Sequence, residues 1–586
     1  MKSSLRTRPI RSDSGIVGNL LNADLHPLLH RVYLGREIVN SEEVELGLEN
    51  LLSPIGLLGL DEASNLLCAA LKVQSRVLIV ADFDADGATS CVLAIRALRS
   101  FGFDSVDYIV PNRFEFGYGL TPEIVEMAKS RHPDLIITVD NGISSVDGVD
   151  VARASGIQTL ITDHHLAGRV LPNADVIVNP NQPGCKFKSK ALAGVGVVFY
   201  LMLGLRRALR EQGYFKKTQI IEPRLSELLD LVALGTVADV VPLDRNNRIL
   251  VDEGIKRIRA GHSRPGIYNL LRLAGKAPES LVASDLGFYV GPRLNAAGRL
   301  DDMATGIECL LADDDSSSYS LAGQLDAMNK ERKTIEAKMK ADAFGVVETL
   351  TLDQKSLPAG ICLFDPNWHQ GVVGLVASRV KDKWHRPTIA FADAGSVGGN
   401  KELKGSARSI GGIHIRDVLE TIDNKHPELI EKFGGHAMAA GLSLKADQLA
   451  NFKNAFNLRV EEVITEDQLH SQLVTDGELE ERWLKLEVAE MLAAAGPWGQ
   501  GFPEPTFHGN FFVVQFKRVG ANHLKFVLRP SSSSPELLDA IAFNIDEEDW
   551  PEDTLKGIKI VFRLDINEYR GVRRLQLLIQ SIVERS

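Results

Sequence analysis

Cysteine pairs and long apolar runs are what this sequence lacks most clearly. Its five cysteines lie far apart and form no CxxC pair, which argues against a disulfide framework or a zinc knuckle and favours a reducing cytoplasm. The most apolar stretch, residues 195–205, has about half of the ~20 residues that a membrane-spanning helix needs, so we expect a buried helix there. The N-terminus is basic but no apolar segment follows it, so we expect a loose tail rather than a signal peptide.

Positive charge is also in short supply. The chain has 66 Lys and Arg against 77 Asp and Glu, a net charge of −11, so any contact with a polyanion must be local. With 44% hydrophobic and 24% charged residues, the composition is that of an ordinary globular protein and argues against disorder, a fibre or a multi-span membrane protein. Since 586 residues exceed what one core supports, we expect three or four domains of roughly 100–200 residues each.

From about residue 76, short apolar runs end in polar clusters and alternate with helix-like segments. The runs are RVLIVADFDADG, DLIITVDNG, QTLITDHH and, further on, LLDLVALGTVADVVPL. This pattern is typical of buried parallel strands in an α/β sheet, and such sheets bind ligands just outside the carboxyl ends of their strands. The sequence therefore predicts that four polar clusters meet in one crevice.

The first cluster has a carboxylate at every second residue: Asp82, Asp84 and Asp86. In an extended segment these side chains project to the same side, and like charges held so close call for a cation. An acidic surface loop is the alternative interpretation, although four apolar residues lead directly into the cluster.

The other runs end in further candidate ligands, which are Asp140, His164, His165 and Asp239. Asp140 precedes Asn-Gly, so turn chemistry is its alternative interpretation. The paired histidines lie beside an acid that can orient one ring. Asp239 lies in an apolar run, where an unpaired carboxylate would be costly. Carboxylates with one or two imidazoles and no thiolate suit two Mn²⁺ or Mg²⁺ ions, and two ions roughly 3.5–4 Å apart suit phosphoester hydrolysis.

Beyond these runs the chain changes character twice. Residues 318–344 have the spacing of a long amphipathic helix, which either links two lobes or is an ordinary surface helix. A second glycine-rich α/β-like block follows over about 358–441. From about residue 470, short alternating runs predict a small barrel, either an oligonucleotide-binding barrel or another small β-domain.

The strings DFDADG, VDNG, DHH and ADVVP, in this order and spacing, resemble the motifs of the DHH phosphoesterase family. The later strings GPRLNAAGR, KGSARS and FGGHAMAAG resemble motifs of the RecJ exonucleases within it, and the resemblance covers about residues 25–580. It implies an α/β fold with a parallel-sheet DHH catalytic domain, a second α/β DHHA1-type domain joined by a long helix, and a C-terminal OB-like β-barrel. The limits that we expect are 1–45 for a tail and helical segment, 46–315 for the catalytic domain, 316–348 for the helix, 349–465 for the second domain and 466–586 for the barrel.

The resemblance also implies an activity: a single-strand-specific DNA exonuclease that works from the 5′ end and releases 5′-mononucleotides in recombination and repair. It makes metal ligands of Asp84, Asp86, Asp140, His164 and Asp239, with Asp82 either a further ligand or a close neighbour of the ligands, and places His165 against the substrate phosphate. It assigns a 5′-phosphate pocket to Arg113, Ser406 and Arg408. Further substrate contacts are expected from Tyr118, Arg293, Asn295 and His436, and the aromatics Phe114, Phe116 and Tyr118 are either stacking platforms or core.

Two other functions stay open on the sequence. One is a DHH-family phosphodiesterase that acts on short oligonucleotides or cyclic dinucleotides, although such an enzyme needs no C-terminal β-domain. The other is a non-catalytic replication scaffold, which would be free to lose ligands that are all present here. From the family we expect single-stranded DNA, a single-strand-binding protein and a RecQ-type helicase as partners, no membrane, and a cytoplasmic monomer.

Overall fold

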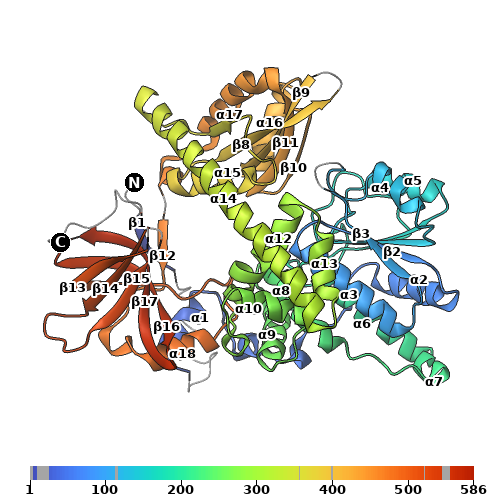
Figure 1. Cartoon of the computed structure of the whole chain (residues 1–586), viewed down its shortest axis with the longest axis horizontal. Helices are drawn as coiled ribbons and strands as arrows, with labels where there is room; N and C mark the ends of the chain where they lie inside the picture. Colours follow the sequence, from blue (N-terminus) through green and yellow to red (C-terminus); the bar gives the residue numbers. More distant parts are fainter. Residues whose placement is uncertain are drawn as a thin grey trace.

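Three lobes and one long helix make up the chain (Figure 1). The structure is a computed structural model that describes residues 4–9, 25–112, 116–354, 357–397, 400–470, 472–520, 522–543, 545 and 555–585. The first lobe runs from blue to green in Figure 1, the second is yellow to orange, and the third is red. The long helix α14 (Asp315–Gln354) leaves the first lobe and runs along the second.

A parallel five-stranded sheet is the centre of the first lobe, in the order β3-β2-β4-β5-β6. Alternate residues of β2 enter two cores: Ile79 joins the larger cluster with α3 and α6, and Leu78 joins the smaller cluster with α4 and α5. The bounds are β2 (Val77–Ala81), β3 (Val106–Ile109), β4 (Leu135–Val139), β5 (Gln158–Thr162), β6 (Val176–Val178), α2 (Leu60–Lys72), α3 (Ala85–Phe101), α4 (Pro122–Lys129), α5 (Val146–Ala154) and α6 (Gly194–Glu211). The predicted parallel sheet is confirmed.

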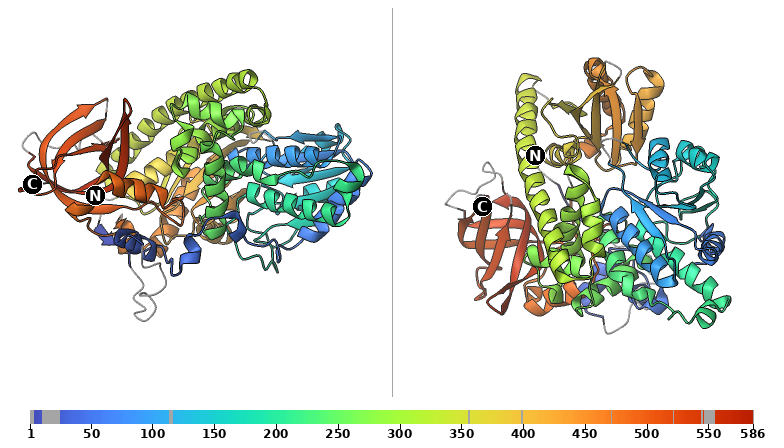
Figure 2. Two further views of the ribbon diagram at one scale, coloured as in Figure 1. Left: turned by 90° about the horizontal axis from the view of Figure 1, so that it is seen from below. Right: turned by 45° about the vertical axis from the view of Figure 1, so that its right-hand side comes forward.

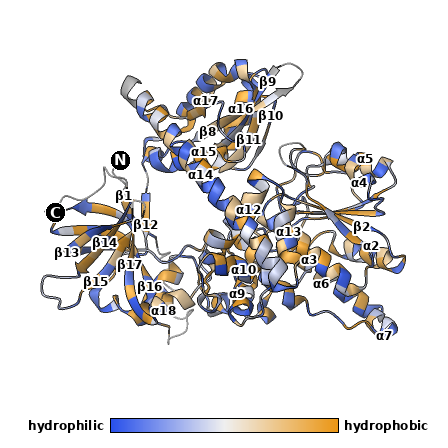
Figure 3. Ribbon diagram, in the orientation of Figure 1, coloured by the Kyte–Doolittle hydropathy of each residue, from blue (hydrophilic) through white to orange (hydrophobic). Residues whose placement is uncertain are grey.

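The apolar stretch 195–205 lies in α6 and is almost entirely buried, as predicted. Figure 3 shows much hydrophobic colour on α3 and α6, which cover the same face of the sheet. No helix within the described ranges has both the length and the apolar character needed to cross a membrane.

The fourth apolar run is a helix, so its prediction as a strand is wrong. Residues 229–238 form α8 (Leu229–Ala238), and Asp239 lies at its C-terminal end. The first eight residues of α8 are buried on all sides, so the sequence carries no helical period, and a short apolar run does not distinguish a buried helix from a strand. Three helices that follow in the chain pack against α8: α9 (Arg245–Arg259), α11 (Ala283–Asp285) and α12 (Gly291–Leu300). The other helices of this lobe are α7 (Tyr214–Thr218), α10 (Pro265–Leu273) and α13 (Ala304–Leu311).

The extended geometry predicted for the first acidic cluster is also wrong. β2 ends at Ala81, and Asp84 is the N-cap of α3, where its Oδ1 accepts hydrogen bonds from the backbone N–H groups of Asp86 (2.9 Å) and Gly87 (3.1 Å). Asp86 therefore lies in the first turn of α3. An Asp followed by small residues favours such a cap, and the cap ended the strand earlier than the acidic alternation suggested.

The second lobe has a mixed sheet in the order β10-β11-β9-β8-β7. Only β7 and β8 pair in parallel among its described strands. Its elements are β7 (Ile361–Phe364), β8 (Thr388–Val397), β9 (Asn400–Arg408), β10 (Lys432–Gly435), β11 (Ala439–Lys445), α15 (Val373–Trp384), α16 (Ile415–Lys425) and α17 (Leu449–Val463). The prediction of a long helix between two lobes is confirmed by α14, whose middle is largely hydrophilic in Figure 3.

The third lobe is a closed barrel in the order β13-β14-β15-β17-β16. Phe507, Phe526 and Phe562 are fully buried in it. Its elements are α18 (Leu486–Ala494), β13 (Phe507–Val519), β14 (His523–Arg529), β15 (Leu538–Ala542), β16 (Gly557–Tyr569) and β17 (Val572–Arg585). The expected OB-like barrel is therefore present, and the views in Figure 2 show it beside α14 and the first lobe.

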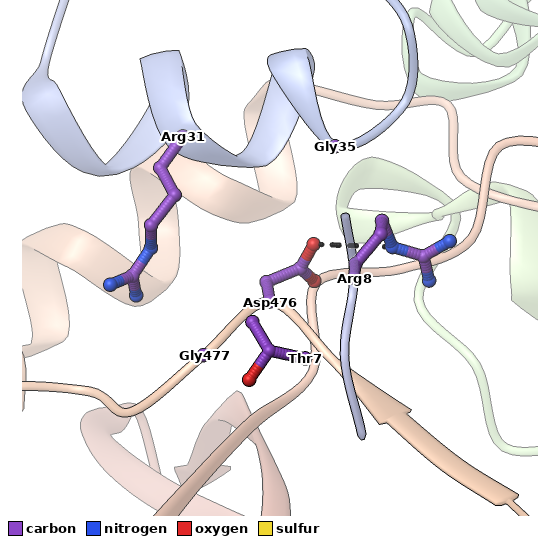
Figure 4. A pocket seen from close by; sticks show the side chains of 6 residues that line it. All are labelled: Thr7, Arg8, Arg31, Gly35, Asp476 and Gly477. Atoms are coloured by element: carbon purple, nitrogen blue, oxygen red, sulfur yellow. Dashed lines mark ion pairs between the residues drawn. The ribbon is translucent and has the colours of Figure 1, made fainter. Parts of the chain in front are cut away.

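The N-terminal segment joins the first lobe to the barrel, so the prediction of a loose tail is wrong for its described part. Strand β1 (Ser4–Thr7) pairs in parallel with β12 (Gln472–Thr475), which precedes the barrel. After helix α1 (Pro27–Leu34), Arg36 donates two hydrogen bonds to Asp476, of 2.8 and 3.0 Å, and both side chains are buried. Figure 4 shows Arg8 reaching Asp476 from β1, beside a small cavity of about 130 Å³. Such pairing between segments so distant along the chain leaves no local signal in the sequence.

Candidate metal centre

The carboxyl edge of the parallel sheet carries the predicted ligands. Asp82 follows β2, Asp140 follows β4 and His164 follows β5, while Asp239 reaches the same edge from the end of α8. Asp140 has a left-handed backbone (φ 62°), which is uncommon outside glycine and turns this residue sharply at the strand end. Three parallel strands and one helix end thus deliver acids and an imidazole to one place.

The side chains form three overlapping groups, and within each group the possible ligand atoms lie within 4.8 Å of one another. Nε2 of His164 lies 3.1 Å from Asp140 Oδ1 and 3.4 Å from Asp239 Oδ2. The groups are Asp140 with His164 and His165, Asp86 with His164 and Asp239, and Asp82 with Asp84 and Asp140. All seven residues predicted as metal or catalytic groups are therefore brought together.

The donor atoms fit a divalent cation. Within the described part of the chain, Asp140 Oδ1, His164 Nε2 and Asp239 Oδ2 are buried and have no hydrogen-bond partner. Buried polar atoms without partners are costly, and bound cations would satisfy these three. Carboxylate oxygens with one imidazole are ligands that suit Mn²⁺ and Mg²⁺.

The pKa values of these side chains also favour a bound cation. Burial, together with the charge of Asp84, raises the pKa of Asp86 to about 7. Burial and the surrounding carboxylates raise the pKa values of Asp140 and Asp239 well above the usual range. Burial and the neighbouring His165 lower the pKa of His164 to about 3, so its ring is neutral and has a lone pair available. These carboxylates need protons or a cation, and a cation leaves them able to work near neutral pH.

His165 is held differently from His164. Its Nδ1 lies 2.7 Å from Asp163 Oδ1, which also accepts hydrogen bonds from the backbone N–H groups of both histidines. Burial opposes the charge on His165, but the hydrogen bond and the charge of Asp163 outweigh it and raise the pKa of His165 to about 9. The sequence indicated an orienting acid beside the histidines, yet Asp163 was not among the predicted site residues.

Two glycine-lined contacts were also missed. A Cβ on Gly194 would lie 2.6 Å from the Cβ of Asp140, so only glycine lets the start of α6 approach this acid. The backbone N–H groups of Gly194 and Val195 donate to the two oxygens of Asp86 at 2.6 and 2.9 Å. In the sequence, the Ala-Gly-Val-Gly string at residues 193–196 marks the start of an apolar helix, but it does not show which residue the helix approaches.

Three of the predicted substrate contacts surround the metal centre. The hydroxyl of Tyr118 lies 3.1 Å from the backbone oxygen of Asp140 and 3.1 Å from Nδ1 of His165. His436, from the second lobe, stacks on His165 with ring centroids 5.6 Å apart. Asn295 accepts a hydrogen bond from the backbone N–H of Ala85 (2.8 Å) and so holds the start of α3.

Ser406 and Arg408 form a second cluster on β9. Arg408 Nη1 donates to Ser406 Oγ at 2.9 Å, and both side chains lie against Gly374 near the start of α15. A Cβ on Gly374 would come within 2.7 Å of Arg408 and 2.8 Å of Ser406. A guanidinium, a hydroxyl and a helix N-terminus together suit a terminal phosphate.

The structure places the remaining predicted residues elsewhere or does not describe them. Arg293 is buried and held by Asp326 of α14, with Nε and Nη2 2.9 and 2.8 Å from Asp326 Oδ1. Phe116 packs against the smaller core of the first lobe, in agreement with its alternative interpretation. Arg113 and Phe114 lie outside the described residues.

Comparison with known proteins gives three domain matches. The model of the DHH family, N-terminal domain, matches residues 76–236, the DHHA1 domain matches 356–462 and the RecJ OB domain matches 475–581. The single-stranded-DNA-specific exonuclease RecJ of Salmonella typhimurium is 51% identical over 562 residues, 96% of this chain and 96% of that protein. The protein of the same name from Bacillus subtilis is 33% identical over 592 residues, 99% of this chain and 71% of that protein.

Solved structures agree with these matches. The crystal structure of RecJ in complex with Mn²⁺ from Thermus thermophilus has a TM-score of 0.76 at 27% identity, covering 99% of this chain and 79% of that one. Its counterpart in complex with Mg²⁺ has a TM-score of 0.72 at 26% identity, covering 99% and 78%. The chain therefore belongs to the RecJ family of single-stranded-DNA-specific exonucleases.

Proposed function

We propose that the chain is a metal-dependent exonuclease that hydrolyses phosphodiester bonds of single-stranded DNA, proceeds from 5′ to 3′ and releases 5′-mononucleotides. The observation that carries this proposal is the cluster of buried carboxylate and imidazole atoms that have no hydrogen-bond partner among the described residues. This cluster lies in a chain that belongs to a family of single-stranded-DNA-specific exonucleases.

The residues that would hold two Mn²⁺ or Mg²⁺ ions are Asp82, Asp84, Asp86, Asp140, His164 and Asp239. When bound, the ions supply Lewis-acid activation of water and neutralise charge on the phosphate. Related structures in complex with Mn²⁺ and with Mg²⁺ support both ions as cofactors. Asp140 and His164 each belong to two of the three ligand groups, so these two side chains would connect the groups.

The chain's own groups supply the rest of the chemistry. His165 is fixed through Nδ1 by Asp163 and lies at the edge of the metal centre, so we assign it to the phosphate of the scissile bond. His436 stacks on the same ring from the second lobe and so limits how the phosphate enters. A positioned donor next to the developing charge stabilises the transition state more than the ground state.

Recognition of a 5′ end is assigned to Ser406 and Arg408, with Arg113 as a predicted third member. Ser406 and Arg408 meet beside the start of α15. A terminal phosphate carries more negative charge than an internal one, so these groups would bind it more strongly. Such a cluster on the second lobe supports an exonuclease over a phosphodiesterase for cyclic dinucleotides, which have no chain end.

Several parts of the proposal rest on the family alone. They are the role in recombination and repair, a single-strand-binding protein and a RecQ-type helicase as partners, the monomeric state and the cytoplasmic location. The predicted contact of Arg293 with a backbone phosphate also belongs here, because Arg293 would first have to exchange part of its pairing with Asp326.

The test is digestion of single-stranded oligonucleotides that carry a label at either end, with and without a 5′ phosphate, in Mn²⁺ and in Mg²⁺. We expect a 5′ label to be released first as a mononucleotide, a 3′ label to persist on shortening products, and a matched duplex to resist. Faster hydrolysis of dinucleotides than of a 5′-phosphorylated 30-mer would contradict the proposal, as would initial release of the 3′ label.

A further inference from the structure

Helix α12 reaches from the core of the first lobe to the core of the second. Its Leu294 and Ala297 are buried in the main core of the first lobe, together with residues of α3 and α8. Its last residue, Leu300, packs instead against the cluster of the second lobe that contains Trp368 and Val373. Figure 1 shows α12 at the junction of the two lobes. One helix of ten residues therefore contacts both lobes.

The part of α12 in the first lobe touches the segment that carries the acidic ligands. Asn295 Oδ1 accepts a hydrogen bond of 2.8 Å from the backbone N–H of Ala85, which lies between two proposed ligands. A Cβ on Gly298 would lie only 1.9 Å from the carbonyl oxygen of Phe83, which also lies between two of them. No side chain fits in that space, so this approach requires glycine. The acidic segment after β2 is thus in direct contact with α12.

The C-terminal end of α12 holds the loop from which α15 starts. Arg299 Nη1 donates a hydrogen bond of 3.1 Å to the carbonyl oxygen of Gly371. A Cβ on Gly371 would lie 2.2 Å from the carbonyl oxygen of Arg299, so the two backbones touch. Gly371 directly precedes the N-cap residue of α15. Three residues later, Gly374 in the first turn of α15 lies against Ser406 and Arg408. The proposed 5′-phosphate cluster is thus connected to α12 through the start of α15.

α12 is itself fixed against α14. Nε and Nη2 of the buried Arg293 lie 2.9 and 2.8 Å from Asp326 Oδ1 of α14, and its Nη1 donates to the carbonyl oxygen of Tyr289 at 2.7 Å. Gly298 and Arg299 are neighbours in α12, where each residue adds about 1.5 Å along the axis. The contact with the acidic segment and the contact with the α15 loop are therefore held at a fixed spacing.

Release of a mononucleotide requires a defined spacing between the two faces. The terminal 5′ phosphate and the first scissile phosphate of a strand are separated by one nucleoside. In the proposed function the terminal phosphate binds Ser406 and Arg408 while the scissile phosphate reaches the metal centre. A wider spacing would bring the next phosphodiester to the metals and release a dinucleotide. A smaller shift would leave the bond out of line, and about 1 Å of misplacement can cost about 100-fold in rate.

We propose that Arg299 is a positioning residue that sets the length of the released product. By holding Gly371 it keeps the start of α15, and with it the 5′-phosphate cluster, one nucleotide away from the metal centre. Arg299 acts through the backbone of Gly371 and not by contact with the strand. This inference rests on the proposed function and adds a determinant of product length to it.

The test compares Arg299→Ala, Arg299→Lys and Gly371→Ala in the Mn²⁺-loaded enzyme, on a 30-mer with a labelled 5′ phosphate. Arg299→Ala removes the hydrogen bond, and Gly371→Ala pushes the two backbones apart. Both should lower kcat by roughly 10- to 100-fold and release dinucleotides among the first products. KM should change by less than about twofold, because neither cluster loses a group. Arg299→Lys keeps a donor and should recover part of kcat and of mononucleotide release.

A strand with a 5′ hydroxyl separates spacing from damage to the metal centre. It does not engage both faces, so its kcat should fall by less than about twofold in Arg299→Ala and Gly371→Ala. The affinity for Mn²⁺, measured by calorimetric titration, should equal that of the wild type.

Arg259→Ala and Gly323→Ala are the matched controls. Arg259 Nε donates to the carbonyl oxygen of Leu281 at 2.8 Å within the first lobe, so its loss removes the same kind of hydrogen bond. A Cβ on Gly323 of α14 would meet nothing within 4 Å outside its own helix. Neither control should change kcat or product length.

Three results would overturn the inference. The first is mononucleotide release without dinucleotides in both Arg299→Ala and Gly371→Ala. The second is an equal fall in kcat on 5′-hydroxyl strands, and the third is loss of Mn²⁺ affinity, since either would mean that α12 supports the metal centre and not the spacing. Failure of the proposed function is distinguishable from these, because the wild type itself would then release no mononucleotide from the 5′ end.

Discussion

The two faces that meet at the centre of the molecule carry opposite chemistry. The sheet edge of the first lobe gathers five carboxylates, and the pKa values of Asp86, Asp140 and Asp239 are raised above the usual range by burial and by the charge of neighbouring carboxylates. The facing sheet of the second lobe presents Ser406, Arg408 and His436 instead. One face suits cations and the other suits anions. We therefore propose that a reaction on a charged chain end uses both faces.

The relative position of the two faces is fixed by α14 as well as by direct contact. Glu336 on α14 accepts hydrogen bonds from Arg332 of the same helix (2.6 Å) and from Arg379 of α15 (2.9 Å). The stack of His165 on His436 is the contact at the metal centre itself. Since a shift of about 1 Å in a reacting group can cost much of its effect, contacts at two places would favour the end recognition that we propose.

The largest expected effect comes from breaking the cation-binding face. Asp140→Asn keeps the size of the side chain and tolerates the left-handed backbone, but it removes a charge shared by two ligand groups. We expect a fall in kcat of roughly three orders of magnitude or more on a 5′-phosphorylated 30-mer. Rate measurements and calorimetric titration with Mn²⁺ check this, with exposed Asp150→Asn as the control. Wild-type Mn²⁺ affinity in Asp140→Asn would contradict the ligand assignment.

Breaking the anion-binding face should have a smaller and more selective effect. Arg408→Ala removes the guanidinium beside Ser406 and α15, and a charged hydrogen bond of this kind is worth about 1.5–3 kcal/mol. We therefore expect the preference for a 5′ phosphate over a 5′ hydroxyl to fall roughly 10- to 100-fold. Competition between the two substrates measures it, with Lys425→Ala on α16 as the control. Loss of Mn²⁺ affinity in Arg408→Ala would break the separation of the two faces.

The sequence predicted most of the first face and less of the second, for physical reasons. Parallel strands must end at one edge, so Asp140 and His164 could be placed together from their positions alone. Asp239 was correctly placed with the other ligands, but as the end of a strand. The run before it is the helix α8, which is buried on all sides and therefore shows no helical period in the sequence. Contacts between distant segments had no such local signal, as with Gly194 against Asp140.

The same limit applies between lobes. The pairing of Arg293 with Asp326 and the gap left by Gly374 for Arg408 each depend on how two elements pack, which spacing does not encode. Family motifs indicated that Arg293 and Arg408 matter, but the two arginines lie in different settings. Arg408 donates a hydrogen bond to Ser406 beside a helix start, whereas Arg293 forms a buried ion pair with Asp326.

The smallest expected effect is on how the stability of the protein depends on pH, which should come from the carboxylate face alone. In the metal-free protein the native state holds more protons than the unfolded state, because Asp86 titrates near pH 7 when folded and near 3.8 when unfolded. Stability of the metal-free protein therefore falls as pH rises from about 4 to 7, and stays lower above that range. His165 acts in the same direction at higher pH, since the stability from its raised pKa is lost as pH rises toward 9. Mn²⁺ removes the repulsion and binds the deprotonated acids, so it should stabilise the protein more at pH 8 than at pH 6.

Thermal melting with Mn²⁺ and with EDTA at both pH values measures this difference. Each kcal/mol of added stability should raise Tm by roughly 2–4 °C for a domain of about 150–250 residues. Asp86→Asn should shrink the difference between the two pH values, whereas Arg408→Ala, on the opposite face, should leave it unchanged. A Mn²⁺-induced shift in Tm that is equal at pH 6 and pH 8 would mean that these carboxylates do not carry the raised pKa values, and the contrast between the two faces would then rest on geometry alone.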